Sequence, residues 1–246
     1  MRKRDVILAI AGLLVAWQLA SMLISKPILP PPWEVLAAFV SELPKDLGRH
    51  TAVSAGRVIA SILVAVAIAV PAGLALGLSP AADRLAAPAI YLLYPIPKIV
   101  FLPVILLLLG IGNTSKVFII ALILFFQMLV VVRDEAANLR PELIASVRSL
   151  GAGRRAIFRF VYLPACLPAV LTSLRVSIGT AIAVLFFAES FATSSGLGYY
   201  IIVETWGRLA YPEMYAGVVA MSLLGLILYF AVDRLQGRLC PWLAVS

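Results

Sequence analysis

Long apolar runs separated by short polar segments dominate the pattern along this chain. Six runs are read as helices that cross a hydrocarbon core of about 30 Å, which needs roughly 17 to 25 residues; the fourth run is short, and its ends are expected to extend by a turn. They must be helical, because an open strand would leave its backbone polar groups unpaired in lipid. The predicted spans are residues 6–24, 53–78, 90–109, 117–132, 167–187 and 214–232. The pattern therefore predicts an all-α membrane protein of about six transmembrane helices, forming one domain over residues 1–246.

The composition supports a lipid environment. Hydrophobic residues make up 63% of the 246 residues and charged residues 13%. A soluble domain of this length carries about a quarter charged residues, so lipid must cover much of this surface. The net charge of +8 is not gathered on one basic face but lies between the apolar runs. We therefore expect the bilayer, and no nucleic acid, as a partner.

The distribution of basic residues predicts the orientation. With a cytoplasmic N-terminus, the cytoplasmic segments hold twelve Lys and Arg and the opposite segments hold five. The positive-inside rule then places both termini in the cytoplasm. The first run follows Arg2, Lys3 and Arg4, as a signal peptide would, but it is too long and no A-x-A site follows it. We expect it to be retained as a span.

The segment 133–164 is the only long charged loop, with six arginines and three acidic residues. Its pattern predicts two short helices. Pro141 suits the first turn of one helix, and Leu143, Val147 and Leu150 form an apolar stripe along it. Gly151 is expected to end that helix in a left-handed turn. A second helix over 154–162 is expected to stop at Leu163-Pro164, before the fifth span.

Two functions suit such a loop. It is either a basic anchor that sits on anionic headgroups, or a helix-turn-helix whose apolar stripe docks in a groove of a cytoplasmic partner. The run Leu150-Gly151-Ala152, followed by Leu163-Pro164-Ala165, resembles the cytoplasmic loop signature of binding-protein-dependent ABC importer permeases. In that family a Glu stands six residues before the glycine, and here Ala145 takes its place. The resemblance implies an ATPase-coupling loop made by Ala145, Ser146, Val147, Leu150, Gly151, Ala152, Arg154, Phe158 and Pro164.

Other motifs extend the resemblance over nearly the whole chain. Residues 29–32 (LPPP), 94–98 (YPIPK), 110–112 (GIG) and 194–198 (SSGLG) are similar to the nitrate, sulfonate, taurine and bicarbonate branch of that family. The resemblance implies a type I importer permease fold in the inner (plasma) membrane of a prokaryote. It also implies a homodimer, two separate ATPase subunits that hold ATP and Mg²⁺, and an external solute-binding protein. The expected solute is a small anion such as a sulfonate, nitrate or bicarbonate.

The chain itself is not expected to be an enzyme or to hold a cofactor. The sequence has no G-x-x-x-x-G-K-[ST], the motif that binds ATP phosphates. An intramembrane enzyme would need a nucleophile with a base, or a metal cluster, at membrane depth. The one histidine, His50, is expected in a solvated external loop, and Cys166 and Cys240 are expected to be reduced and inert.

A few polar residues at membrane depth are candidates for the translocation path. Lys98 follows Pro95 and Pro97, which break the third span, and it either lines the route for an anion or extends to the headgroups. Arg175 lies well inside the fifth span and either supports the bundle or lines the path. Glu189, Ser194 and Ser195 follow at the external end of that span. The glycine-containing segment 194–198 is either a gate at the outer mouth or a plain polar loop.

One further pattern concerns helix packing. Gly73 and Gly77 form a G-x-x-x-G in the second span, which favours close helix approach, here expected within one chain. The alternative function is an ion-coupled secondary transporter acting alone, which needs buried carboxylates near the midplane and usually an inverted repeat. The acidic residues lie in loops or at span ends and no repeat is evident. The sequence therefore favours a permease driven by a partner.

Overall fold

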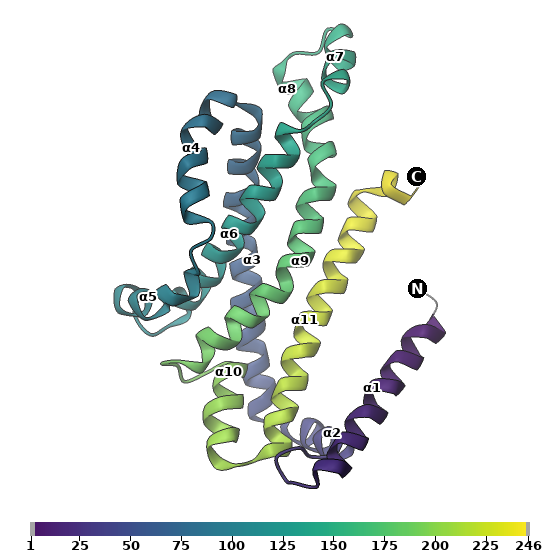
Figure 1. Cartoon of the computed structure of the whole chain (residues 1–246), viewed down its shortest axis with the longest axis vertical. Helices are drawn as coiled ribbons and strands as arrows, with labels where there is room; N and C mark the ends of the chain where they lie inside the picture. The colour runs from purple at the N-terminus through teal and green to yellow at the C-terminus, as the bar shows by residue number, and fades with distance from the viewer. Residues whose placement is uncertain (1–2, 245–246) are drawn as a thin grey trace. The chain divides into compact units, whose positions relative to one another are not determined.

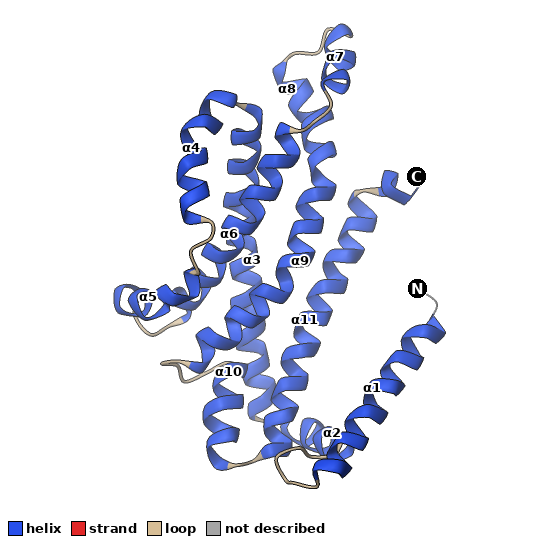
Figure 2. Cartoon of the chain, viewed as in Figure 1, coloured by secondary structure: helices blue, strands red, loops and turns tan. Residues whose placement is uncertain are grey.

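A computed structural model describes residues 3–244, and their regular elements are all helical (Figure 2). Arg2, counted above among the cytoplasmic basic residues, lies outside the described range. The α-helices are α1 Lys3–Ile24, α2 Pro32–Glu42, α3 Asp46–Leu78, α4 Pro80–Leu93, α5 Leu102–Leu109, α6 Asn113–Ala137, α7 Pro141–Ser149, α8 Arg154–Ile157, α9 Leu163–Ser190, α10 Leu197–Tyr199 and α11 Tyr211–Leu239 (Figure 1). Shorter 3₁₀ and π-helical turns are Lys98–Phe101, Phe158–Tyr162, Tyr200–Thr205, Trp206–Arg208 and Pro241–Ala244.

The six predicted spans correspond to five continuous helices and one bent pair. The five helices long and apolar enough to cross a membrane are Arg4–Ile24, Asp46–Leu78, Asn113–Ala137, Arg154–Ser190 and Tyr211–Leu239. Most of them run beyond the predicted apolar runs, because helices continue into polar residues that hydropathy does not count. The prediction of an all-helical protein with about six spans is confirmed.

The third predicted span is not one straight helix. It consists of α4 and the segment Lys98–Leu109, which meet at an angle of 77°. Pro95 and Pro97 lie in the break, where they offer no backbone donor and push the preceding residues out of the helical conformation. The bend therefore follows from the two prolines that the sequence had placed there.

By their internal contacts the residues form two compact units, whose boundaries fall within α3, α9 and α11. Unit 1 combines Met1–Ala55 with Glu189–Leu224, and unit 2 combines Gly56–Ala188 with Gly225–Ser246. Unit 1 holds α1, α2, α10 and the segment 200–208 that follows it. Unit 2 holds α4 to α8 and most of α9. The prediction of a single permease domain stays a prediction.

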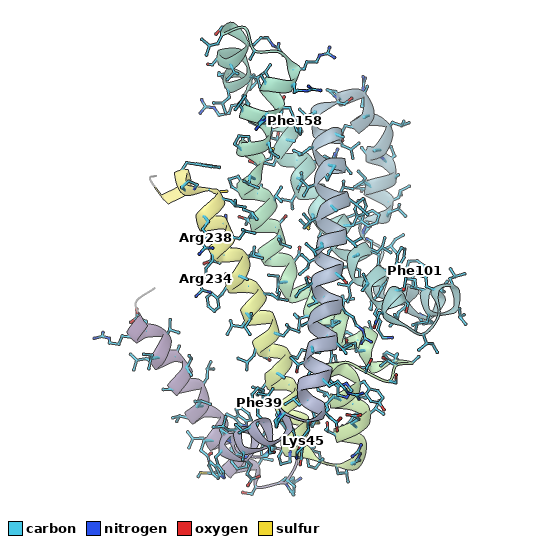
Figure 3. All side chains as sticks on the ribbon, turned by 180° about the vertical axis from the view of Figure 1, so that it is seen from behind. Phe39, Lys45, Phe101, Phe158, Arg234 and Arg238 are labelled. Atoms are coloured by element: carbon cyan, nitrogen blue, oxygen red, sulfur yellow. The ribbon has the colours of Figure 1, made fainter. Side chains whose placement is uncertain are left out.

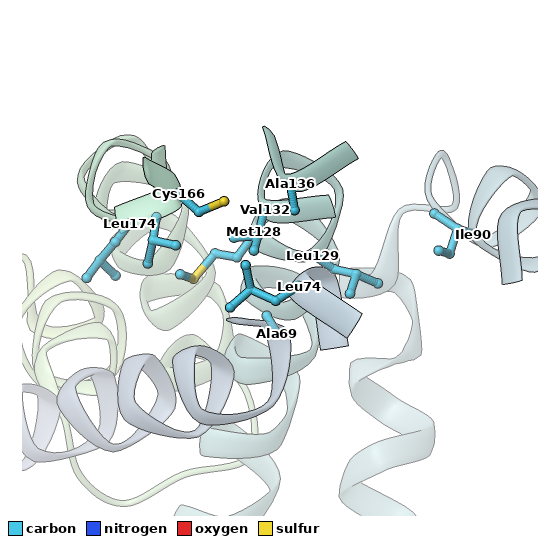
Figure 4. Close-up of a cluster of buried hydrophobic side chains, with 10 residues drawn as sticks. Ala69, Leu74, Ile90, Met128, Leu129, Val132, Ala136, Cys166 and Leu174 are labelled. Carbon is cyan, nitrogen blue, oxygen red and sulfur yellow. The ribbon is translucent and has the colours of Figure 1, made fainter. Parts of the chain in front are cut away.

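The core of unit 2 forms where α3, α6 and α9 meet. Met128 and Val132 of α6 are fully buried there, beside Leu74 of α3 and Leu174 of α9 (Figure 4). Gly73 and Gly77 make the approach of α3 to α6 close. A Cβ atom on Gly73 would lie 2.8 Å from Cβ of Val132, and one on Gly77 would lie 2.6 Å from Cβ of Ala136. The expected use of G-x-x-x-G within one chain is confirmed.

The predicted stop at Leu163-Pro164 is wrong. The helix runs on from Arg154 through a π-helical turn, Phe158–Tyr162, directly into α9. Proline has no backbone N–H to donate. At Pro164 this costs little, because the residue follows a π-helical turn in which the hydrogen bonds already span five residues instead of four. In that turn the Leu163 N–H donates to the Phe158 carbonyl, five residues back. A 37-residue helix, Arg154–Ser190, therefore contains both the second helix of the loop and the fifth predicted span.

Both cysteines are free thiols and both are buried. Cys166 packs in the core cluster of unit 2, while Cys240 follows α11. Burial raises the pKa of the Cys240 thiol, because the thiolate would lose its hydration. A protonated, buried thiol is a poor nucleophile, in line with the inert role expected from the sequence.

The contact of α3 with α6 gives a first testable prediction. Gly77→Ala places a methyl group 2.5 Å from the Arg133 carbonyl oxygen, a backbone atom that cannot move aside easily. We expect it to destabilise the protein by about 1–3 kcal/mol, the usual range for overpacking. A matched control is Gly56→Ala on the same helix, where the added Cβ meets nothing within 4 Å. Thermal unfolding in detergent should show a lower midpoint for Gly77→Ala only, and equal midpoints would contradict this contact.

Candidate functional site

The loop between α6 and α9 forms a short helix-turn-helix in unit 2, at the end where α6 ends and α9 begins (Figure 1). Gly151 ends α7 with φ of +83°, in the left-handed region. Its N–H donates to the Arg148 carbonyl at 2.9 Å, and the Ala152 N–H donates to the Val147 carbonyl at 3.4 Å. These two bonds form a Schellman motif, which satisfies helix-end carbonyls and reverses the chain. The turn predicted at Gly151 is thus formed by its backbone.

The two helices present different faces. On α7, the apolar stripe is left uncovered within the described residues: Leu143 is 47% and Leu150 85% exposed. On the second helix, Ile157 and Val161 are buried. Phe158 is exposed in the π-helical turn at the base of the loop, where the chain continues into α9 (Figure 3). An exposed apolar stripe on a helix held by a rigid turn is a surface suited to docking in a groove.

The remaining predicted coupling residues lie on or beside this surface. Ala145 and Ser146 are exposed on α7, Val147 and Ala152 are partly buried, and Arg154 is exposed at the start of α8. Pro164 is the exception, because it lies in the continuous helix rather than at a helix end. The predicted coupling residues between 145 and 158 therefore lie on one short helical segment, and their coupling role stays a prediction.

Lys98 occupies the bend between α4 and α5. Its Nζ donates to the carbonyls of Leu93 and Tyr94, at 2.7 and 2.6 Å, and lies 4.4 Å from the centre of the Phe126 ring. The two carbonyls lie at the C-terminal end of α4; Pro97, four residues after Leu93, has no N–H to give to the Leu93 carbonyl, which instead accepts the Ile96 N–H at 3.3 Å. The lysine thus caps the broken helix with its charge, as cations favour helix C-termini.

A cavity of about 350 Å³ opens at this bend. Lys98 lines it together with Tyr94 and Pro95, and Phe126 and Gln127 of α6 line it from the facing helix. Gln127 is the only polar residue in the predicted span 117–132, and sequence reasoning passed over it. A lone amide inside an apolar span was the signal that could have identified it.

Arg175, the second intramembrane cation, is paired. Its Nη1 donates to Oδ1 of Asp233 on α11 at 2.6 Å, and its guanidinium lies 5.8 Å from the centre of the Tyr229 ring. Lys98 and Arg175 have separate partners, so the structure does not bring them into one cluster. The role of Arg175 in the translocation path stays a prediction; the contacts found here are those of an ion pair between α9 and α11.

In unit 1, Glu189 is fully buried and holds the turn 193–198. Its carboxylate accepts the Gly198 N–H at 3.1 Å and the Ser54 hydroxyl at 2.7 Å. Ser54 Oγ in turn accepts the Leu197 N–H at 2.7 Å. Gly196 has φ of +111°, and a Cβ there would collide with the Glu189 carboxylate. Side chains from α3 and the end of α9 therefore bind the amides of this turn.

The two serines predicted beside Glu189 lie in the same turn. Ser194 is exposed, and the Thr193 hydroxyl donates to the Ser195 carbonyl at 3.1 Å. The structure thus groups Glu189, Ser194 and Ser195 in unit 1. Whether this turn takes part in solute passage stays a prediction.

The expectation that His50 is a solvated loop residue is wrong. Helix α3 begins at Asp46, so His50 lies within a helix, and its side chain is fully buried. Nδ1 accepts the Gly196 N–H at 2.9 Å, and Nε2 lies 3.2 Å from Oε2 of Glu204. His50 and Ser54 are four residues apart, which places both on one face of α3 toward the turn. Hydropathy alone could not find this, because the polar first turns of α3 carry no apolar signal.

A family model and individual relatives both match components of membrane transport systems. Residues 56–245 match the family described as "Binding-protein-dependent transport system inner membrane component". The taurine transport system permease protein TauC of Escherichia coli (strain K12) is 34% identical over 251 residues, covering 97% of this chain and 90% of that protein. The putative aliphatic sulfonates transport permease protein SsuC of the same organism is 27% identical, covering 94% of this chain and 89% of that protein.

A solved structure shows the same fold. A chain of the MetNI methionine ABC transporter, in an inward-facing conformation, aligns with a TM-score of 0.63 at 20% identity. The alignment covers 78% of this chain and 95% of that chain. At this identity the likeness concerns the fold alone, which is that of a type I ABC importer permease.

The buried contacts of Ser54 give the second testable prediction. Ser54→Ala leaves the Leu197 N–H without its acceptor and removes the hydroxyl donor to Glu189. We expect a loss of about 1–3 kcal/mol, the usual effect of an unsatisfied buried group. Limited proteolysis should show faster cleavage at 191–198. Ser222→Ala is the control, because Ser222 is exposed and donates only to a carbonyl of its own helix. Equal cleavage rates in the two variants would refute the role of Ser54.

Proposed function

This chain belongs to the family of binding-protein-dependent transport system inner membrane components and is the permease subunit of an ABC importer, and we propose that it imports small organic sulfonates, driven by separate ATPase subunits. The observation that carries the coupling part of this proposal is the exposed apolar stripe on α7, held beside α8 by the Gly151 turn. An apolar stripe at the tip of a projecting loop calls for a protein partner that covers it.

Continuity of the helix supports a route for the coupling. The loop's second helix runs without a break into the fifth span, from Arg154 to Ser190. A push on α7 and α8 therefore reaches the span as a movement of a rigid helix. ATP binding closes the two partner ATPases. This draws together the permease loops that dock on them and opens the path outward, and ATP hydrolysis returns the permease to its starting conformation.

Two arguments support these partners: the family to which the chain belongs, and the lack of an ATP-binding motif in this sequence. ATP and Mg²⁺ belong to the two ATPase subunits, since the permease sequence has no phosphate-binding glycine motif. A second copy of the permease completes the membrane part, and an external binding protein delivers the solute. With both termini in the cytoplasm, as the excess of basic residues favours, α7 and α8 face the ATPases.

Two observations support a sulfonate as the solute. Relatives that cover most of the chain are named for taurine and for aliphatic sulfonates. Lys98 also brings a positive charge to a cavity in unit 2. An anion is the solute that such a charge attracts.

The third prediction tests the coupling loop. Gly151→Val forces a β-branched residue into a backbone with φ of +83°, although its Cβ meets nothing within 4 Å. We expect normal insertion and continued ATP hydrolysis, with solute uptake reduced at least about tenfold, because the turn that aligns α7 with α8 is lost. The control is Gly153→Ala in the same loop, with φ of −75° and open space around its Cβ. Normal uptake by Gly151→Val would remove the loop from the coupling route.

The fourth prediction tests the partners. Affinity purification of the tagged chain from native membranes in mild detergent should recover a nucleotide-binding subunit in stoichiometric amount, with vanadate-sensitive ATPase activity. If the chain instead purifies alone and moves solute down an ion gradient, it acts as a secondary transporter and the loop is a topological anchor.

A further inference from the structure

A second cavity, of about 230 Å³, lies within unit 1 where several helices begin or end. Its acidic lining comes from the last residue of α2, the first residue of α3, the segment 200–205 and the first turn of α11: Glu42, Asp46, Glu204 and Glu213. Arg208 is the one basic residue among those that line it. Four carboxylates around one guanidinium make this cavity negative, so that it attracts cations and repels anions.

Two of the four carboxylates have side-chain partners. Oε2 of Glu204 lies 3.2 Å from Nε2 of the buried His50, and Lys45 Nζ donates to Oε1 of Glu42 at 2.9 Å, at the junction of α2 and α3 (Figure 3). Asp46 and Glu213 form no hydrogen bond or ion pair with another side chain among residues 3–244. These two carboxylates can therefore accept hydrogen bonds from an incoming cation.

The Tyr200 hydroxyl indicates a ligand independently of the acidic residues. Tyr200 is only 3% exposed and lines the cavity, yet its hydroxyl forms no hydrogen bond within the part of the chain that the structure describes. Burial raises the pKa of this phenol, and the four carboxylates of the cavity raise it further because they face its hydroxyl. A buried hydroxyl without a partner is unfavourable, and an N–H cation in the cavity would donate to its oxygen.

An organic cation fits this lining better than a metal ion does. A calcium ion needs about six to eight oxygen ligands at about 2.3–2.6 Å. Among the described residues, no group of three or more acidic, histidine or cysteine side chains is placed to hold a metal ion. A guanidinium or ammonium group is larger and carries three to five N–H donors, so it can bind acceptors that lie apart from one another.

The size and charge of the cavity favour a protein side chain as the source of this cation. Its volume is below the range of about 300–1,000 Å³ that is usual for small-molecule pockets. The proposed solute carries a sulfonate, which the surrounding carboxylates would repel. A lysine or arginine side chain brings positive charge alone.

The place of the cavity in the chain indicates which protein supplies that side chain. With a cytoplasmic N-terminus, α1 crosses the membrane once, so that α2 and the first residue of α3 lie on the outer side. The partner that meets the permease on that side is the external solute-binding protein of the proposed function.

We propose that the acidic cavity of unit 1 is a docking site for a lysine or arginine side chain of the external solute-binding protein, an inference that rests on the proposed function. The N–H groups of that side chain donate to the carboxylates of Asp46 and Glu213 and to the Tyr200 hydroxyl oxygen. Arg208, which is exposed, opposes docking through its like charge.

The test measures the affinity of the solute-binding protein of the same transporter for the permease–ATPase complex in lipid nanodiscs, by biolayer interferometry at about 50 mM and about 500 mM salt. The variants are Asp46→Asn, Glu213→Gln, Tyr200→Phe and Arg208→Gln. Glu34→Gln is the matched control, because Glu34 is an exposed carboxylate about 12 Å from Glu42 along α2 and does not line the cavity. Size-exclusion chromatography checks that each variant assembles with the ATPase.

Asp46→Asn and Glu213→Gln should each weaken docking about tenfold at the lower salt concentration and less at the higher one, as expected for loss of a charged hydrogen bond. Tyr200→Phe should weaken it about threefold at both, since it removes a neutral acceptor. Arg208→Gln should strengthen docking about threefold, because it removes a like charge. A merely structural role of these residues predicts no such gain, and the exposed Arg208 can be replaced even if a buried variant fails to assemble.

The source of the cation is tested by reversing charges on both partners. Glu213→Lys should abolish docking, and replacing one lysine or arginine of the binding protein by glutamate should restore it.

Three results would overturn the docking site: unchanged affinity in both Asp46→Asn and Glu213→Gln, an equal loss in Glu34→Gln, or weaker docking with Arg208→Gln. Failure of every lysine or arginine replacement to restore docking to Glu213→Lys would overturn the assignment to a side chain of the binding protein. A wild-type complex to which no solute-binding protein docks would overturn the proposed function itself. The two kinds of failure are therefore distinguishable.

Discussion

In lipid, backbone N–H and C=O groups cannot form hydrogen bonds with water. Wherever a helix is interrupted, the chain itself must therefore supply partners for the groups that are freed. The bend at Pro95 and Pro97 frees carbonyls at the end of α4, and the Lys98 ammonium takes two of them. The bend in the helix and the charge that lines the cavity thus have one cause. The carbonyls at the end of α4 need donors, and the lysine ammonium has three. The residue that supplies these donors also brings its positive charge to the cavity.

The turn 193–198 meets the same requirement with the opposite groups. Here amide donors rather than carbonyls need partners, and acceptors are supplied by Glu189, Ser54 and His50. The three side chains converge from α3 and the end of α9, all within unit 1. Carboxylate, hydroxyl and imidazole acceptors thus bind the amides of Gly196, Leu197 and Gly198, which stand at the start of α10 and have no acceptor within that helix.

Hydropathy predicted the number and approximate place of the spans, because lipid selects strongly for apolar residues over about 20 positions. It failed where a helix continues without apolar residues. The polar first turns of α3 hid His50, and the charged helix before Pro164 was separated from α9 although the two are continuous. The Gly151 turn was predictable because a positive φ has a residue signature. The partners of Lys98 and Glu189 were not, since they lie far along the chain or on the backbone.

Three cations of unit 2, Arg133, Arg175 and Lys98, are neutralised to different degrees, and this bears on where an anion can be held. Arg133 forms a bidentate pair with Asp83, and Arg175 pairs with Asp233, so each has a full countercharge. Lys98 contacts the dipoles of two carbonyls and the rings of Tyr94 and Phe126. An anion that approached either arginine would have to displace a carboxylate, which is strongly unfavourable, whereas at Lys98 it displaces a ring contact. Of these three cations, the lysine at the bend is therefore the one whose surroundings leave it able to hold a passing anion weakly enough to release it.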